Sequence, residues 1–490
     1  MTLPVPALLS PVLLPPVLPG HAFGLRYGLP LPLAQFVVGG AAVVVLSFVL
    51  VRLRAPTASR PAIGTGGTAG TAGTADVDVP PPRALRPLPA FASFTGLGLL
   101  VGCGLAGSDQ VAENLLPTTF WLVLWIVVPL TCAVVGDWTR PLNPFANLVR
   151  ALDRPAVRRA VLGREQPLRL PAAVGWWPAV ALLLLLTCGE LVVNLTATRP
   201  HVIAGGLVVY ALVDAALGLL VGSAWLERGE VFSVLFATWG RLGVWRFGAA
   251  GRRGPGGGLD APFERSTGRV AFVLLLLVGV TVDGVLATPL WGRVERGLGQ
   301  REVQGLRTLV LLGVAAGVGL LFAAFAVAST RAVGLRSGPR DPLVGLLPSL
   351  LPIAFGYLLA HNAQYVMVNL QLLLPLVGNP LGLPGSNLHL PFPFNDTFEP
   401  SPTFLPAAFY WYVGLVAIVA AHVVAVVVAH RRLAAQGSSA GVDPALARRG
   451  EYPWLVAMVA YTVFSLVLIA QPLVQDAGPG PTQPVALHGP

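Results

Sequence analysis

Long apolar runs are the feature that most constrains this chain. About ten of them, each near twenty residues or longer, recur between Leu33 and Val474. A helix rises 1.5 Å per residue, so about 20 residues cross the roughly 30 Å hydrocarbon core of a bilayer. The runs are Leu33 to Val51, Leu88 to Gly107, Leu115 to Val135, Val174 to Val193, Val202 to Gly222, Val270 to Leu290, Leu306 to Ala328, Leu343 to Val377, Ala407 to Ala429 and Trp454 to Val474. They predict an all-α integral membrane protein with about ten transmembrane helices.

Composition favours one membrane domain over several soluble domains. Of the residues, 54% are hydrophobic and 11% are charged, whereas soluble domains carry roughly 25% charged residues. The predicted parts are an apolar, Pro-rich leader or outer-face extension (1–20), a first span (33–56), a flexible cytoplasmic linker rich in Gly and Thr (57–87), a polytopic domain with nine further spans (88–474) and an outer-face tail (475–490).

Arginine placement predicts the orientation. The net charge of +10 comes from Arg alone, and most Arg follow the odd-numbered runs, as in the segment 150–169. Short cytoplasmic loops are enriched in basic residues, so we expect both termini outside a plasma membrane. The segment from Trp291 to Arg307 is the exception, since it is basic but predicted outside. This charge pattern concerns topology and membrane lipids, and it indicates no nucleic-acid partner.

Three local features refine this picture. The eighth run is too long for one straight span, and Pro348 and Pro352 predict an interruption there. Two inner segments, which begin DWTRPLNPFANL and GEVFSVLFATWGRLG, mix aromatic, apolar and Arg residues and predict helices lying in the interface. The interfacial anchors would be Trp239, Arg241, Trp245 and Arg246. Cys103, Cys132 and Cys188 lie singly in apolar runs and are interpreted as packing residues.

Four ionisable residues fall near the middle of apolar runs: Asp214, Asp283, His361 and His422. A charge at the bilayer centre costs at least about 2.5–3.5 kcal/mol, so each needs a partner, water or a function. Tyr365 shares a helix face with His361, and such a face has to pack on protein or line a cavity.

The spacing of these residues leaves three interpretations open. Two carboxylates and two imidazoles at similar depth could hold a divalent transition metal that activates water, with His430 as a further ligand. The same residues could form buried Asp–His pairs that hold helices together, or a path for protons or ions. No Walker A, H-E-x-x-H, G-x-S-x-G or C-x-x-C motif is present.

Several strings resemble a known family. They are HAFGLRYGLPLP before the first run, DWTRPLNPFANLVRAL after the third, VDGVLATPLW in the sixth and AAHVVAVVVAHRR in the ninth. Together they are similar to the actinobacterial multi-pass membrane proteins commonly labelled fenitrothion hydrolase. The resemblance implies metal-assisted hydrolysis of organophosphorus triesters, with Asp283, His361, His422 and His430 at matching positions. Where some members carry a second His after His361, this chain has Asn362.

Three function classes follow. A membrane-embedded hydrolase of a small-molecule ester would use Asp283, His361 and His422 as catalytic residues, with Asp214, Asp283, His361, His422 and His430 as metal ligands. A transporter or proton conduit would use the same midplane residues to pass a solute or a proton. A structural or assembly protein would pair them in a closed core.

Overall fold

The computed structural model describes residues 33–54, 85–247, 254–260, 263–332, 341–401, 403–439, 443 and 448–470. The expectations for the leader (1–20), the outer-face tail (475–490) and nearly all of the 57–87 linker fall outside these residues.

Every regular element of the described residues is helical, which confirms the all-α prediction. The helices that coincide with the ten runs are α1 (Leu33–Arg54), α2 (Pro87–Ala106), the continuous α3, η1 and α4 (Leu115–Pro117, Thr118–Val127 and Val128–Val135), α7 (Trp177–Leu191), α9 (Pro200–Val221), α12 (Thr267–Leu286), α14 (Gln300–Ala332), the stretch α15 to α17, α18 (Ala407–Ser439) and α20 (Glu451–Ala470). Within the described part, eight helical stretches are long and apolar enough to cross a membrane, while α7 and the apolar part of α1 are shorter. The chain is therefore a polytopic membrane protein.

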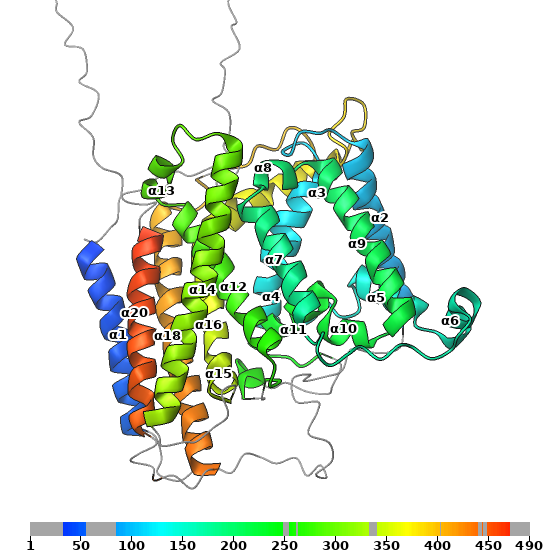
Figure 1. The fold of residues 1–490 in the computed structure, drawn as a ribbon. Coiled ribbons are helices and arrows are strands. Elements are labelled where there is room, and N and C mark those ends of the chain that lie inside the picture. Colours follow the sequence, from blue (N-terminus) through cyan, green and yellow to red (C-terminus); the bar gives the residue numbers. More distant parts are fainter. Residues whose placement is uncertain are drawn as a thin grey trace, which may run out of the picture.

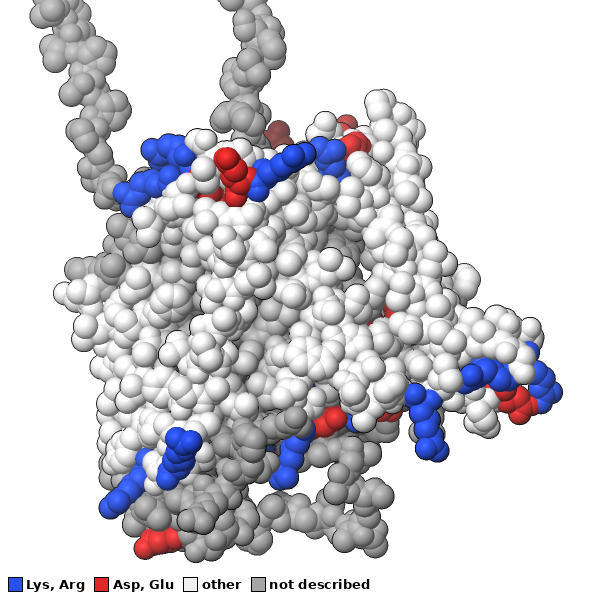
Figure 2. All heavy atoms as spheres, viewed as in Figure 1, with Lys and Arg blue, Asp and Glu red and all other residues white. Residues whose placement is uncertain are grey.

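Short helices connect the long ones. They are α5 (Pro144–Leu152), α6 (Pro155–Leu162), α8 (Asn194–Ala197), α10 (Ala224–Arg228), α11 (Val231–Gly240), η2 (Gly257–Leu259), α13 (Pro289–Val294) and η5 (Arg448–Gly450). In Figure 1, α8 and α13 lie at the upper end of the molecule and α10 and α15 at the lower end. Nearly all charged side chains on the face shown in Figure 2 lie at these two ends, and the broad band between them is uncharged. This is the surface expected of a protein whose middle contacts lipid.

The long helices and two of the short ones, α5 and α11, pack in two groups that share α12. One group contains α1, α14, α16, α18 and α20, with α16 against α18 and α1 against α20 (Figure 1). The other contains α2, α4, α5, α7, α9 and α11, with α2 and α5 against α9 and α11 against α4. Helix α12 contacts α14 and α16 on one side and α7 on the other. Any site between α7, α12 and α16 is therefore held by both groups.

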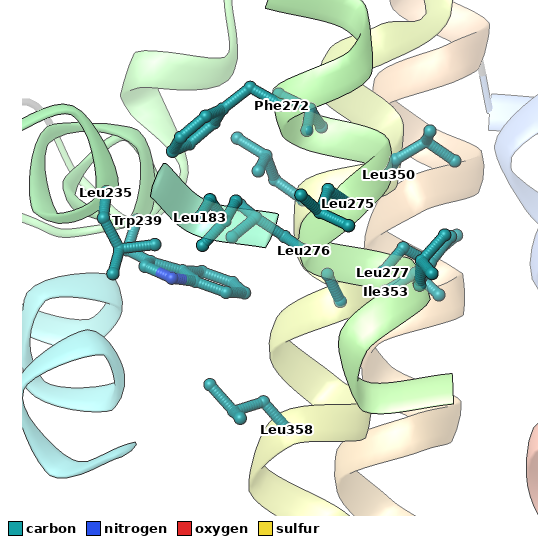
Figure 3. Close-up of a cluster of buried hydrophobic side chains, with 14 of the residues drawn as sticks. Leu183, Leu235, Trp239, Phe272, Leu275, Leu276, Leu277, Leu350, Ile353 and Leu358 are labelled. Carbon is teal, nitrogen blue, oxygen red and sulfur yellow. The ribbon is translucent and has the colours of Figure 1, made fainter. Parts of the chain in front are cut away.

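An apolar core joins the two groups at α12. Figure 3 shows Leu183 of α7 and Trp239 of α11 beside Phe272 and Leu276 of α12, with Ile353 of α16 on the far side of α12. All five side chains are buried, and Phe272 has no exposed surface. Since lipid offers little hydrophobic driving force, close packing of this kind is what fixes helix positions in a bilayer.

Helix α11 corrects one prediction. Trp239 and Arg241 were expected as interfacial anchors, yet they are 3% and 2% exposed inside the protein. The reason is that α11 is apolar all round, from Val231 to Trp239, and such a helix is buried on every side instead of lying on a surface. The other two predicted anchors are exposed, as an interfacial position requires: Trp245 has 50% exposure, and Arg246 is also exposed.

The predicted interruption of the eighth run is confirmed. Helix α15 (Asp341–Leu346) gives way to the 3₁₀ turn η3 (Leu347–Ser349), which contains Pro348, before α16 (Leu350–Asn369) begins. A second 3₁₀ turn, η4 (Leu370–Leu372), separates α16 from α17 (Leu373–Gly378). The helix thus changes to 3₁₀ geometry on both sides of α16, the segment that carries His361.

The segment from Trp291 to Arg307, which is the exception to the arginine pattern, lies at the upper end, and part of its positive charge is neutralised there. Arg307 Nε lies 2.6 Å from Glu295 Oε1, and the indole of Trp291 donates to the same oxygen at 2.5 Å. Burial favours a raised pKa for Glu295, but the hydrogen bonds from Arg307 and Trp291 outweigh it, and the pKa is lowered. The carboxylate therefore stays charged beside Arg307.

Gly356 permits a close contact between α16 and α18, which gives a stability prediction. A Cβ at this position would lie 2.4 Å from Ala421 Cβ and 2.7 Å from the carbonyl oxygen of Ala417, both on α18. We expect Gly356→Ala to lower the free energy of unfolding by about 1–3 kcal/mol, because α16 and α18 have to separate. Thermal unfolding in detergent measures this. Gly317→Ala on α14 is the control, since nothing lies within 4 Å of its Cβ. An equal melting temperature for both variants would contradict the contact.

Candidate functional site

The central feature of the site is a close pair of ionisable residues on two helices. His361 Nε2 of α16 lies 2.8 Å from Asp283 Oδ2 of α12. The side chain of His361 is 8% exposed and that of Asp283 is 22% exposed. The ring of Tyr357, one turn before His361, lies nearly parallel to the imidazole with the ring centroids 6.1 Å apart. A partly buried carboxylate thus faces an imidazole, a combination that can hold or release a proton.

A second carboxylate approaches this pair from α7. Glu190, the next-to-last residue of α7, interacts electrostatically with Asp283, and the side chain of Trp125 lies close to it. Tyr365 of α16 lies near enough to interact electrostatically with both carboxylates. We call Trp125, Glu190, Asp283, His361 and Tyr365 the upper polar site, because Glu190 and Asp283 lie near the upper ends of their helices.

Trp125 reaches the site from an unusual helix. Residues Thr118–Val127 form a π-helix inside the third span, with α-helix before and after it. π-helical turns are rare and occur frequently at functional sites, because they cost backbone stability and re-aim side chains. Here the widened turns carry Trp121 and Trp125 on the surface that faces α7, where Trp121 donates to the carbonyl of Ala197 and Trp125 reaches Glu190.

His422, predicted beside Asp283, lies instead in a cluster of its own in the middle of the bundle. It is 1% exposed, and Nδ1 lies 2.8 Å from the carbonyl oxygen of Ile418 on the same helix. Its nearest aromatic neighbour is Tyr461 of α20, whose ring centroid is 6.1 Å away. The hydroxyl of Tyr461 lies 2.6 Å from Thr281 Oγ1 of α12.

His430 is placed at the lower end of the bundle. Its Nδ1 lies 2.9 Å from Glu451 Oε1, and this contact ties α18 to the first turn of α20. Eight residues separate His430 from His422, a rise of about 12 Å along the helix. Buried Ala425, Val426 and Ala429 occupy the intervening turns, so the two imidazoles belong to different environments.

Asp214 belongs to a polar network in the second helix group. It has no exposed surface and accepts a hydrogen bond from the indole of Trp225 at 2.6 Å. Near it, Glu230 is also fully buried and caps α11 by accepting from the backbone amides of Phe232 and Ser233. The Tyr210 hydroxyl donates to Glu230 at 2.7 Å.

The network continues into α5. Asn143 caps α5 and donates to Glu230 Oε2 at 2.8 Å, so the first turns of α5 and α11 meet inside the protein. Arg150 donates to Asn147 at 2.8 Å, and Asn147 donates to Ser93 of α2 at 3.0 Å. Burial lowers the pKa of Arg150 to about 10, and the nearby carboxylate of Glu230 opposes that shift. These bonds hold three helices together at the lower end.

The five predicted metal ligands are therefore divided among four places. Asp283 and His361 are together, whereas Asp214, His422 and His430 lie in three other clusters. Within the described ranges, no group of three or more His, Cys, Asp or Glu side chains is arranged to hold a metal ion. A protein-bound catalytic metal usually has three protein ligands, so this donor set does not fit one.

Sequence reasoning did not select Trp125, Glu230 or Asn143. Glu230 directly precedes the apolar run of α11, and Asn143 precedes Pro144, which are both recognisable helix-start signals. Those signals predict that each residue caps its helix, but they do not predict that Glu230 and Asn143 contact each other. Trp125 offers no local signal, because π-helical geometry is not visible in the pattern of apolar residues.

The fold and the upper polar site define a polytopic membrane protein with a partly buried ionisable pair between α12 and α16. No protein-family model, no curated protein and no solved structure matches the chain.

The Glu230 cap gives a second stability prediction. We expect Glu230→Ala to lower the free energy of unfolding by about 3 kcal/mol, because two backbone amides and the Tyr210 hydroxyl lose their acceptor. Chemical unfolding in detergent measures the loss. Glu227→Ala is the matched control, since Glu227 is a partly exposed carboxylate on the adjacent α10. Equal effects of the two substitutions would show that the network contributes little.

Proposed function

We propose that this protein is a transporter that binds a proton or a small cation at the upper polar site. The observation that carries the proposal is the Asp283–His361 pair, at 2.8 Å, with a second carboxylate beside it inside a membrane domain. Intramembrane Asp, Glu and His residues are expensive and are characteristic of ion pathways and proton relays. Two carboxylates and one imidazole favour a positively charged ligand.

The helices around the site support transport. The π-helix η1 and the 3₁₀ turns η3 and η4 interrupt spans that line or flank the site, and interrupted helices at the binding site are typical of secondary transporters. Asp283 keeps 22% exposure, whereas buried Ala425 and Met458 lie below His422. We infer that the site is reached from the upper end, as in one state of an alternating-access cycle.

The same proposal includes a location. We infer that the lower end faces the cytoplasm and that the protein resides in the plasma membrane, because the Arg-rich segment 150–169 lies at that end. The partners are then membrane lipids and a small solute.

Transport is tested in proteoliposomes that contain a pH-sensitive dye. Under an imposed membrane potential, we expect wild-type protein to acidify the lumen, and Asp283→Asn or His361→Gln to reduce the rate at least about tenfold, since each removes a proton-binding group. Asp283→Glu should recover part of the rate.

The chain supplies a matched control pair. His201 Nδ1 lies 2.6 Å from Asp109 Oδ1 at the upper end, with 52% and 63% exposed side chains. Asp109→Asn and His201→Gln remove the same chemistry from the surface and should leave the rate unchanged. Transport of protons would be contradicted if the lumen of vesicles with wild-type protein acidified no faster than that of empty vesicles under any imposed gradient.

Hydrolysis is a second candidate, favoured by one observation. The carboxylate of Asp283 contacts the imidazole of His361, and in many enzymes such a carboxylate orients a histidine that acts as a general base. A base of this kind activates water without a metal. The resemblance to the proteins labelled fenitrothion hydrolase supports a phosphotriester as the substrate.

The hydrolase candidate is tested with purified protein and a nitrophenyl phosphotriester. We expect His361→Ala to lower the rate about 10²–10⁴-fold, as loss of a general base does, and a chelator to leave it unchanged. His201→Ala is the control. A wild-type rate no higher than that of His361→Ala would exclude His361 as the base.

A further inference from the structure

A second group of buried polar atoms lies below the upper polar site, between α12, α16, α18 and α20. Its members are Tyr357, His422, Tyr461, Ser465 and Thr281; Tyr461 is partly buried and the other four are buried, with Tyr357 2% exposed. Among the described residues, neither the Tyr357 hydroxyl nor His422 Nε2 has a hydrogen-bond partner. Leaving such groups unpaired costs about 1–3 kcal/mol each, so they call for an additional partner.

The donors and acceptors in this group can be assigned. Thr281 Oγ1 donates to the carbonyl of Leu277 at 2.7 Å, which uses its single proton. The Tyr461 hydroxyl, 2.6 Å from Thr281 Oγ1, is therefore the donor of that bond, and its own oxygen is left to accept. In His422, Nδ1 donates to the Ile418 carbonyl, so Nε2 of the neutral ring carries a lone pair.

Small residues bring these polar groups together. Gly284 lies against the Tyr357 hydroxyl, since a Cβ there would be 2.0 Å from it, and Gly284 is three residues beyond Thr281 on the same face of α12. The hydroxyls of Tyr357 and Tyr461 thus approach neighbouring turns of one helix. Gly356 and Ala421 meet where α16 crosses α18, and their next residues are Tyr357 and His422.

The group is continuous with the upper polar site. Tyr357 lies near both Tyr461 and Asp283. Its ring also lies against that of His361. Ser465 lies one turn after Tyr461, and among the described residues its buried hydroxyl also has no hydrogen-bond partner. Polar atoms therefore extend from the Asp283–His361 pair to His422 in the middle of the bundle.

We propose that Tyr357, Tyr461, Ser465 and His422 enclose ordered water molecules that link the Asp283–His361 pair to His422. A buried water needs two to four polar partners, and this group supplies two hydroxyls and an imidazole nitrogen in addition to Ser465. A proton that leaves the pair passes along the water oxygens, each accepting one proton and releasing another, and ends on His422 Nε2. This role in proton movement rests on the proposed function, whereas the hydration does not.

X-ray radiolytic footprinting of the full chain in detergent tests the hydration. Radiolysis of bound water produces hydroxyl radicals that label adjacent side chains. We expect Tyr357 and Tyr461 to be labelled at least about tenfold faster than Phe272, which has no exposed surface and lies in the apolar core. Labelling of both tyrosines at the rate of Phe272 would overturn the proposal.

The role of His422 is tested separately in the proteoliposome assay. His422→Phe should reduce proton uptake at least about tenfold, and His422→Gln, which keeps a polar side chain, should reduce it less. His422→Phe should also slow the labelling of Tyr461, because the water loses a partner. Uptake by His422→Phe at the wild-type rate would overturn the relay. If the wild-type protein showed labelled tyrosines but no proton uptake, the bound water would be supported and only the proposed transport would be refuted.

Discussion

The contact between Asp283 and His361 is the interaction on which the arrangement of the helices depends. An ionisable side chain inside a membrane domain needs a partner, and the contact between α12 and α16 supplies one by bringing the two residues within 2.8 Å. Helix α12 also packs on α7, and this contact brings Glu190 to the same place. The two helix groups are thus joined by a polar contact as well as by the apolar core around Phe272.

Irregular helices follow from that constraint. A regular span presents side chains at fixed angles, and the site needs groups from four spans at one depth. The π-helix Thr118–Val127 re-aims Trp125, and the 3₁₀ turns on either side of α16 set where His361 lies along the bundle. Each irregularity weakens local backbone bonding, so its persistence indicates that the contacts it permits are worth more than it costs.

The sequence predicted the membrane fold well, because bilayer thickness and backbone hydrogen bonding leave few alternatives. All ten apolar runs coincide with helices, and the interruption at Pro348 was visible from proline chemistry. The site was predicted only in part. Depth along a helix identified Asp283 and His361, but it also selected Asp214, which lies near Glu230, and His422, which lies near Tyr461. The depth counted along the sequence was only approximate, since Asp283 lies near the upper end of α12, and only packing decides which helices are neighbours.

The same limitation explains the error at Arg241 and Trp239. Aromatic and Arg residues beside an apolar segment occur both in helices on a membrane surface and in helices buried under a loop. In this chain Arg241 lies with its guanidinium 4.0 Å from the centroid of Phe263 and donates to the carbonyl of Gly258 at 3.1 Å. These partners are about twenty residues away and come from a Gly-rich segment that resembles a linker in composition. A segment of that composition can therefore still supply the carbonyl oxygen and the aromatic ring that allow a cation to be buried.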